Sequence, residues 1–349
     1  MKLRTSASRV RPFIDRPGIA LLVVTWVALI GDVIARLGTI WAGDFDTYWY
    51  TARQILVGGP IYPNWQLSGP YPLGDAAFGV GYVYPPTAAM LSAPLGLIPI
   101  AVSWSVCLVA VAFALGVVSY QIARKERFTP QASILVAAVV VLSPPSLESL
   151  LTGNVNVLIA CAVGAAWLRP RLGGYMFVVL GLVKIYPILG LIWSIRARVP
   201  IRGPLVVGGS IVLVTLWILG PKPWLDYVSV IVNGQPTSDF ILPAPRAFLG
   251  GMVGSTFATV ATLALTGLLL FFVHRDQHDR RALFLLSWAL ILPAPDWYLH
   301  YLIVPLVGSL PWGLKLLRPR VEGLDDGERW PSWGRRRALS PSAAPLRPT

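Results

Sequence analysis

The sequence predicts an all-α polytopic membrane protein, a bundle of about ten transmembrane or half-membrane helices. The mean hydropathy is +0.64 and only 13% of the 349 residues are charged, against about a quarter in soluble domains. Apolar runs recur from one end of the chain to the other, and basic residues gather in the short stretches between them. That alternation of apolar runs and basic loops is typical of proteins that cross a membrane many times.

The distribution of the basic residues predicts the orientation in the membrane. The basic stretches are residues 2–16, 124–127, 169–171, 196–202, 274–281 and the tail from 315. By the positive-inside rule these loops and both termini are cytoplasmic, and the acidic loops between them lie outside the plasma membrane. A net charge of +13 spread in this way indicates contact with membrane lipids and no nucleic-acid partner. Cys107 and Cys161 lie in apolar runs, so we expect neither a disulfide framework nor a thiolate metal site.

The apolar runs predict the helices in chain order. The first run, 18–40, is too long for a signal-peptide core, so residues 1–18 form a basic cytoplasmic end before a helix at about 19–41. The membrane domain, 19–314, then continues with an outer loop at about 42–100 and helices at about 101–123, 131–146, 153–168, 203–219, 252–273, 282–294 and 297–314. The basic, proline-rich tail 315–349 is expected to be cytoplasmic and disordered.

Residues 173–195 do not fit a single span, because one crossing would put the next basic stretch outside. We therefore predict two half-helices that break at "VKIYP", residues 183–187. Pro187 disfavours a continuous helix, and a break within the membrane is tolerated where it lines a cavity. Lys184 would lie at the outer vertex of the break.

The outer loop is predicted to hold two helices that lie in the outer membrane interface. One follows Asp46 or Thr47, either of which can cap its start, and it stops at Gly58-Gly59-Pro60. The other, at 84–99, is apolar but too short to span comfortably. Both are rich in aromatic or apolar residues, as this depth favours.

Short motifs in this loop and beyond it resemble glycosyltransferase family 87. They are Asp44-Phe45-Asp46-Thr47-Tyr48, "GGPIY" at 58–62, "YPP" at 84–86, "APLGLIP" at 93–99, "GNVNVLI" at 153–159, "KIYP" at 184–187 and "WYLHY" at 297–301. The resemblance covers about residues 40–310. It implies the GT-C fold and a polyprenyl-phosphate-mannose-dependent α-mannosyltransferase activity. The last motif departs from the family pattern, which often carries an acid and two histidines, since here only His300 remains.

The resemblance implies that Asp44 is the catalytic base. In the family such an aspartate takes the proton of the acceptor hydroxyl while that oxygen attacks the sugar, which inverts the anomeric centre; a carboxylate suits this role. The alternative is that Asp44 or Asp46 only caps a helix, and Asp46 is the cap that we favour. An Asp-x-Asp pair also binds metal in nucleotide-sugar transferases, but this chain has no soluble stretch long enough for their α/β domain. No cofactor is expected, and a divalent-metal requirement is left open.

A leaving phosphate requires cations, and the outer half offers four. They are Lys184, Lys222, Arg246 and Arg53. Lys184 is the leading candidate because an intramembrane cation indicates a functional site, and Arg246 is the second. The alternative for Lys184 is a side chain that reaches from a helix end to the interface.

Four further residues are candidates for substrate binding. His300 could hydrogen-bond the acceptor sugar or the donor phosphate, Asn154 and Asn156 could bind sugar or phosphate, and Tyr48 could contact a sugar face. Each has a structural alternative: a packing histidine, an Asn-x-Asn cap and turn, and an interfacial aromatic. Glu148 and Asp296 are outer acids without an assigned role.

The leading hypothesis is a membrane glycosyltransferase with a polyprenyl-phosphate sugar donor and a lipid- or glycan-linked envelope acceptor. A flippase or transporter of lipid-linked sugar is the alternative, but it would place polar residues across the full membrane depth. A non-catalytic scaffold would keep the fold and lose the Asp44 chemistry.

Overall fold

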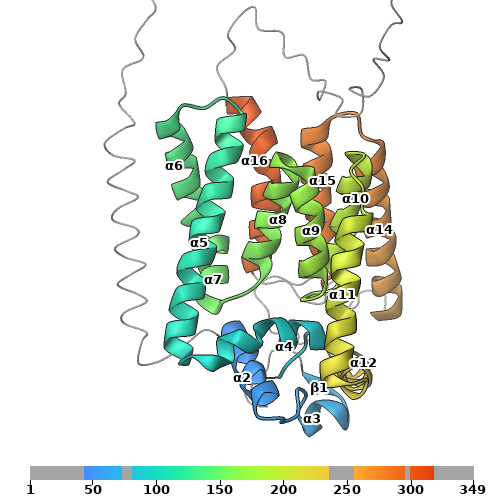
Figure 1. Ribbon diagram of the computed structural model, residues 1–349. Helices are drawn as coiled ribbons and strands as arrows, with labels where there is room; N and C mark the ends of the chain where they lie inside the picture. The colour runs from blue at the N-terminus through green and yellow to red at the C-terminus, as the bar shows by residue number, and fades with distance from the viewer. Residues whose placement is uncertain (1–42, 73–80, 236–254, 295–298, 318–349) are drawn as a thin grey trace, which may run out of the picture.

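The computed structural model describes residues 43–72, 81–235, 255–294 and 299–317. These form a bundle of helices that run along one direction, with a layer of short helices across one end (Figure 1). The bundle comprises α5 (Ile100–Lys125), α6 (Pro130–Val141), α7 (Pro144–Thr152), α8 (Asn156–Leu168), α9 (Pro170–Gly181), η3 (Tyr186–Gly190), α10 (Leu191–Arg196), α11 (Arg202–Leu219), α14 (Ser255–Arg275), α15 (Asp279–Ile291), η4 (Leu299–Leu302) and α16 (Ile303–Leu317).

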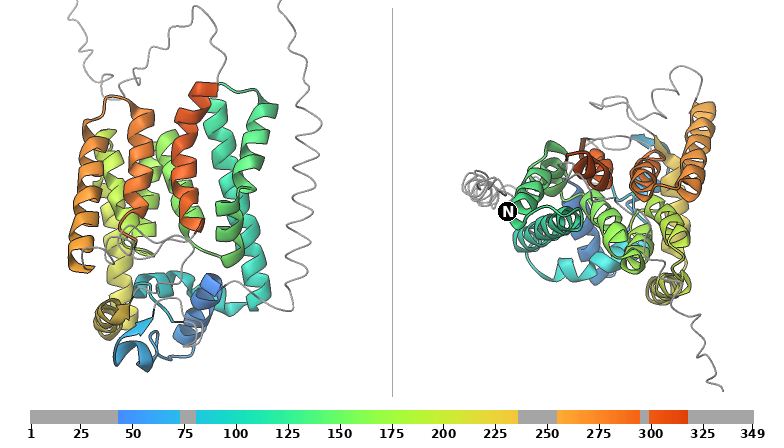
Figure 2. Two further views of the ribbon diagram at one scale, coloured as in Figure 1. Left: turned by 180° about the vertical axis from the view of Figure 1, so that it is seen from behind. Right: turned by 90° about the horizontal axis from the view of Figure 1, so that it is seen from above.

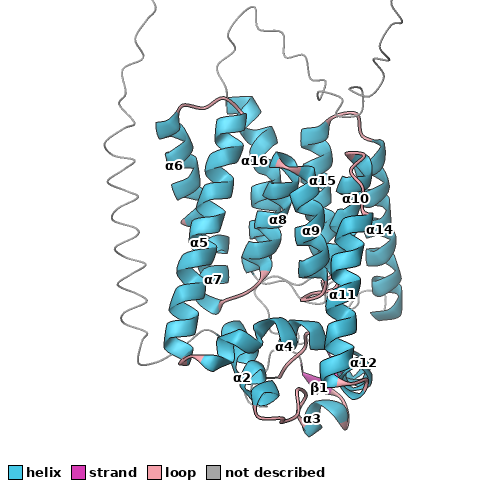
Figure 3. Ribbon diagram, viewed as in Figure 1, coloured by secondary structure: helices cyan, strands magenta, loops and turns pink. Residues whose placement is uncertain are grey.

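The end layer contains α2 (Gly43–Leu56), α3 (Asn64–Leu67), α4 (Pro86–Ser92), η2 (Ala93–Leu97) and α12 (Lys222–Asn233). Among the described residues, β structure is confined to a parallel pair of two residues each, β1 (Tyr71–Pro72) and β2 (Gly234–Gln235). Figure 3 shows that almost everything else described is helix or loop, and the view from behind shows the same arrangement of bundle and end layer (Figure 2). The all-α prediction is therefore confirmed for the described part of the chain.

The long helices have the composition of membrane spans. Within the described residues, four helices are long and apolar enough to cross a membrane: α5, α11, Thr256–Arg275 and Leu299–Leu317. Their outward side chains are large and apolar, as Trp217 of α11 shows with 84% of its surface exposed. Such a surface is unfavourable in water and suits a lipid environment.

The predicted ten crossings are not confirmed. The pair α6 and α7, bent by 59°, would be a fifth span, and we had expected one helix there, at 131–146. Ser143, Pro144 and Pro145 lie at the bend, and proline disfavours an unbroken helix. The predicted helix 19–41, the N-terminal segment and the tail from 318 onward lie outside the described residues.

The predicted break within 173–195 is confirmed. The helix α9 ends at Gly181, residues 182–185 form a turn, and the chain returns as η3 and α10, which pack back against α9. Ile188 lies so close to Gly181 that a Cβ there would be 3.0 Å from the Ile188 Cβ. Lys184 is in the turn, as expected.

Two expectations for the end layer were wrong. The helix α2 begins at Gly43, so Asp46 lies inside its first turn and does not cap it, and the Thr47 hydroxyl donates back to the Gly43 carbonyl at 2.9 Å. The chain enters the helix earlier than the aromatic pattern suggested. The helix α12 was also missed, because its polar ends and short length resembled a loop. The stop of α2 was predicted correctly, with Gly58 at a φ of 70°.

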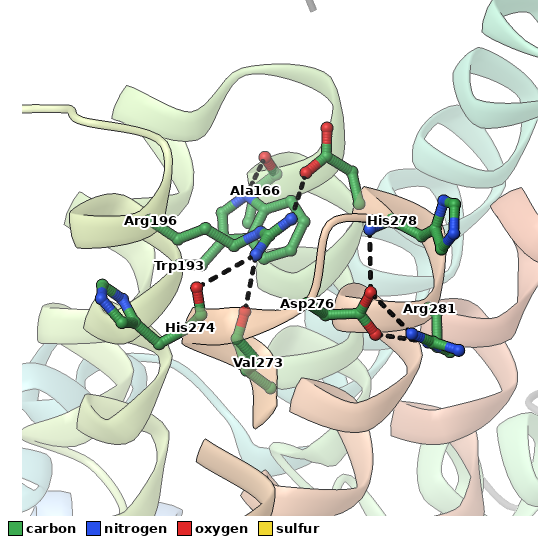
Figure 4. Close-up of polar contacts among 9 residues, drawn as sticks. Ala166, Trp193, Arg196, Val273, His274, Asp276, His278 and Arg281 are labelled. Atoms are coloured by element: carbon green, nitrogen blue, oxygen red, sulfur yellow. Dashed lines mark hydrogen bonds and ion pairs between the residues drawn. The ribbon is translucent and has the colours of Figure 1, made fainter. Parts of the chain in front are cut away.

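The basic stretches that the structure describes gather at the end of the bundle opposite the end layer. There Arg280 pairs with Glu126 at 2.9 Å, joining the start of α15 to the end of α5. Close by, Arg196 donates to the Val273 carbonyl at 2.8 Å and to Asp279 at 2.6 Å (Figure 4). We call this region the basic end and the region around the end layer the site end.

Candidate active site

Asp44 lies in the first turn of α2, where it faces the turn between α7 and α8. Its Oδ2 accepts a hydrogen bond of 2.7 Å from the side-chain amide of Asn154, and its Oδ1 accepts one of 3.4 Å from the Tyr84 hydroxyl. Both donors are neutral, so they hold the carboxylate in place without cancelling its charge. A carboxylate fixed in this way can still attract a proton or a cation.

Gly153 allows Asn154 to come this close. Its φ is 70°, the left-handed conformation that favours glycine, and it ends α7. A Cβ at this position would lie 2.4 Å from the Cβ of Phe45, the neighbour of Asp44. The turn is locked by two contacts between Ser149 and Asn154, one from the Asn154 N–H at 2.8 Å and one from the Ser149 hydroxyl at 3.2 Å. The "TGN" sequence thus brings the amide within reach of α2.

Tyrosine rings form one wall of the site. The rings of Tyr48 and Tyr84 lie 4.6 Å apart between centroids, and Tyr82 packs edge-on against Tyr48 at 6.5 Å. Burial raises the pKa of all three hydroxyls, because desolvation disfavours a phenolate. They remain neutral hydrogen-bonding groups at physiological pH.

Lys184 reaches into this tyrosine wall from the turn between α9 and η3. Its Nζ donates to the Tyr301 hydroxyl at 3.2 Å and lies 4.7 Å from the centroid of that ring. The Tyr84 ring is 6.0 Å away, so one tyrosine contacts both Lys184 and Asp44. Burial lowers the pKa of Lys184 to about 8, and the negative charge of Asp44 opposes that shift. The site thus holds an anion and a cation on neutral partners, and Tyr84 contacts both.

The two asparagines do different things. Asn154 binds Asp44, and its side-chain oxygen also accepts the Asn156 N–H at 2.9 Å. The Asn156 side chain accepts the Tyr186 hydroxyl at 2.7 Å, which ties the start of α8 to η3. The turn role is therefore found in this pair of residues, and the binding of sugar or phosphate by them stays a prediction.

His300 lies in η4, buried, with 4% of its surface exposed. Its ring stacks on Tyr301, with centroids 5.1 Å apart, and its Nδ1 is 3.5 Å from Oε1 of Glu148 in α7. The acid that faces this histidine thus comes from "SLESL", far from it in the sequence.

The other predicted cations do not join the site in the described chain. Lys222 pairs with Asp226 on the surface of α12 at 2.6 Å, and Arg53 donates to the Gly96 carbonyl at 3.4 Å. Arg246 lies outside the described residues. Among those residues no cluster of three or more His, Cys, Asp or Glu side chains could hold a metal ion.

An apolar cavity of about 230 Å³ adjoins Asn154. It lies between α2, α4, η2, α5 and the start of α8. Residues that line it are mainly hydrophobic: Phe45, Ala88, Leu91, Leu95, Trp104, Leu108, Val111, Leu150, Val155 and Leu158. A polar site and an apolar cavity are thus side by side.

Sequence reasoning assigned no role to Tyr84, Tyr186, Tyr301 and Glu148. The three tyrosines were visible as parts of the motifs "YPP", "KIYP" and "LHY", yet a motif does not state what its side chains contact. The signal for Glu148 was weaker still: an acid in a helix of low charge.

The family comparison decides the class of protein. The model of glycosyltransferase family 87 matches residues 82–295. The chain belongs to this family. No curated protein and no solved structure gives a significant match. As a family 87 member the protein is a membrane glycosyltransferase, and the matched range contains Tyr84, Glu148, Asn154 and Lys184. Asp44 and His300 lie outside that range, joined to it by the contacts described above.

Proposed function

We propose that this glycosyltransferase moves a hexose, by resemblance mannose, from a polyprenyl-phosphate donor to a lipid- or glycan-linked acceptor of the cell envelope. The observation that carries the proposal is the pairing of Asp44 and Lys184 across Tyr84. A carboxylate and an ammonium that are held on neutral side chains and share Tyr84 as a neighbour can act on different parts of one substrate.

The proposed reaction is a single displacement. The acceptor hydroxyl oxygen attacks the anomeric carbon, Asp44 takes the hydroxyl proton, and the bond from that carbon to the phosphate oxygen breaks with its electron pair left on the phosphate. Lys184 stabilises the charge that grows on the phosphate. The attack comes from the face opposite the leaving group, so the anomeric centre is inverted. No metal step is invoked.

The surroundings of the site support a lipid-linked substrate. The apolar cavity beside Asn154 suits a hydrocarbon segment, and the site lies at the junction between apolar spans and the end layer (Figure 1). In the described part of the long helices α5, α11 and α14, Lys and Arg occur only at the end distant from the site. Transport of a lipid-linked sugar would favour charged groups across the full depth, and the described parts of these three helices carry charged side chains only at their ends distant from the site.

The proposed location is the plasma membrane, with both termini cytoplasmic and the site on the outer face. Exposed residues at the two ends allow a test after Cys107 and Cys161 are replaced by serine. Leu225→Cys, at the site end, should react with a membrane-impermeant maleimide in intact cells, whereas Leu316→Cys, at the basic end, should react only after lysis. The reverse pattern would place the site in the cytoplasm.

The activity test uses purified protein in nanodiscs with radiolabelled polyprenyl-phosphate mannose and envelope lipid acceptors. We expect labelled acceptor together with an equal amount of released polyprenyl phosphate. Movement of intact donor between leaflets without transfer would favour the flippase, and neither activity would favour a scaffold.

A further inference from the structure

Glu148 is a described acid near the site that the proposed reaction does not use. It lies in α7 with its Oε1 3.5 Å from the Nδ1 of His300, and 31% of its side chain is exposed. The Oε2 atom is buried and has no hydrogen-bond partner among the described residues. A carboxylate half removed from water beside an imidazole is costly unless the contact is used, so the pair needs an explanation.

The position of Glu148 is coupled to the catalytic turn. Its carbonyl accepts the Thr152 hydroxyl at 2.8 Å, and Ser149, the next residue, locks the turn that presents Asn154 to Asp44. The same nine-residue segment, 148–156, therefore contacts α2 through Asn154, η3 through Asn156 and η4 through Glu148. A shift of this segment would move all three contacts together.

The chemistry of the imidazole gives the pair a direction. A carboxylate only accepts hydrogen bonds, so a hydrogen bond between Glu148 and His300 Nδ1, which are 3.5 Å apart, requires the neutral tautomer with its proton on Nδ1. That tautomer carries its lone pair on Nε2, where it can accept a hydrogen bond from a hydroxyl. The stack on Tyr301, which itself binds Lys184, sets the plane of the ring. Two neighbours thus determine both the proton position and the orientation.

We propose that Glu148 is a positioning residue that holds His300 in the Nδ1–H tautomer, so that Nε2 accepts a hydrogen bond from a sugar hydroxyl. The hydrogen bond from a sugar hydroxyl to Nε2 rests on the proposed function, whereas the tautomer of His300 does not. The hydroxyl belongs either to the sugar that is transferred or to the acceptor, and both present the same chemistry.

The tautomer is tested by nitrogen-15 NMR of histidine-labelled protein at alkaline pH, where imidazole is neutral. The chain has three histidines, so His274→Gln and His278→Gln leave the His300 signal alone. We expect Nδ1–H in this background. Adding Glu148→Gln should shift the proton toward Nε2, because the amide N–H can donate to Nδ1. If the protein that keeps Glu148 shows the Nε2–H tautomer, the proposal is overturned, whether or not the protein transfers sugar.

The use of the tautomer is tested by kinetics. Glu148→Gln should lower kcat/KM by about tenfold or more, since partners that orient a functional histidine typically contribute this much. A rise in the donor KM would assign the hydroxyl to the transferred sugar, and a rise in the acceptor KM would assign it to the acceptor. In a His300→Ala background Glu148→Gln should cost nothing further, whereas an additional loss would mean that Glu148 acts through the fold and would contradict the proposal.

Asp226→Asn is the matched control, because it also converts a carboxylate to an amide, at an exposed ion pair. It should leave both the NMR signal and the kinetics unchanged. If the wild-type protein transfers no sugar while the NMR result is as expected, the proposed function fails and the positioning of His300 stands.

Discussion

Both ends of the bundle hold buried charged side chains, but the partners of these side chains differ between the two ends. At the basic end each described acid meets an arginine: Glu126 with Arg280, Asp279 with Arg196, and Asp276 with Arg281. Figure 4 shows the contact between Asp276 and Arg281 at the turn between α14 and α15. At the site end Asp44 binds Asn154 and Tyr84, and Lys184 binds Tyr301.

The difference indicates which end carries chemistry. An acid paired with arginine has its charge neutralised, so it fastens helix ends together and has little left for a substrate. A carboxylate and an ammonium held on hydroxyls and amides keep their charge and their position, which is the preorganised electrostatics that catalysis requires. The basic end is expected to hold the fold, and the site end is expected to react. The following experiments test this division.

The largest effect is expected at Asp44. Asp44→Asn keeps the size of the side chain and removes the base, so transfer should fall by about 10²-fold or more, with little change in expression or donor binding. Asp46→Asn, two residues away in the same turn, is the matched control and should be mild. Transfer assays on both variants give the comparison. Loss in Asp46→Asn with retention in Asp44→Asn would reverse the assignment, and retention in both would place the base elsewhere.

Lys184 should give the next largest effect. Lys184→Ala removes the cation that faces the leaving phosphate and should lower kcat by about tenfold or more, whereas Lys184→Arg should retain much of it, since either cation can bind phosphate. Single-turnover transfer with labelled donor measures this step. Equal rates for wild type and Lys184→Ala would mean that the ammonium only reaches for the interface.

Gly153 links the fold to the site. Gly153→Ala requires an unfavourable φ and brings a Cβ to 2.4 Å from Phe45, so α7 must move away from α2. We expect transfer to fall by about tenfold and stability by about 1–3 kcal/mol. Thermal unfolding in detergent and transfer assays measure both. Gly267→Ala is the control, because a Cβ there meets nothing within 4 Å; a normal Gly153→Ala would disprove the close approach.

Changes at the basic end should affect stability and spare catalysis. Glu126→Gln leaves Arg280 without its charged partner in a mostly buried place and should cost about 2 kcal/mol, less than a fully buried pair because a quarter of Arg280 is exposed. The KM and kcat of the folded fraction should match wild type. Lys222→Ala, which breaks an exposed pair, should cost at most about 0.5 kcal/mol. A kinetic defect in Glu126→Gln would contradict the division between the two ends.

The smallest effect is a dependence on pH at Asp46. Burial raises the pKa of this carboxyl from 3.8 to about 6, so the folded protein holds the proton more tightly than the unfolded chain. Its ionisation therefore destabilises the fold above about pH 6, and stability rises as pH falls from about 6 to 4. Asp46→Asn should unfold at a temperature ~2 °C above wild type at pH 8, and the gap should narrow below pH 6 and close by about pH 4, near the unfolded pKa of 3.8. A gap that widens at low pH would contradict this.

Much of the architecture could be predicted from the sequence because hydropathy and helix breakers act locally. A window of apolar residues predicts α5 and α14 wherever they pack, and Gly58 and Pro187 end or bend a helix through their own backbone. Two predictions from local patterns were wrong. The helix α2 begins at Gly43, before the predicted start at Asp46 or Thr47, and the helix α12 was predicted as part of a loop.

The site residues were predicted one by one, but their partners were not. Asp44 and Asn154 are 110 residues apart and hydrogen-bond directly, and Lys184 meets Tyr301 across 117 residues. Glu148 gained a meaning only from its distance to His300. No local pattern reports such distances, because they depend on how whole helices pack.

The sequence by itself therefore determined that this protein is a membrane glycosyltransferase of family 87 with its basic loops separated from its motif residues. The tertiary structure decided which of those residues act on one another. The physical reason is the separation along the chain over which each effect acts. Apolar runs and backbone preferences depend on residues that are neighbours in the sequence. The hydrogen bond of 2.7 Å between Asp44 and Asn154 instead requires two helices to pack so closely that only a glycine fits between them.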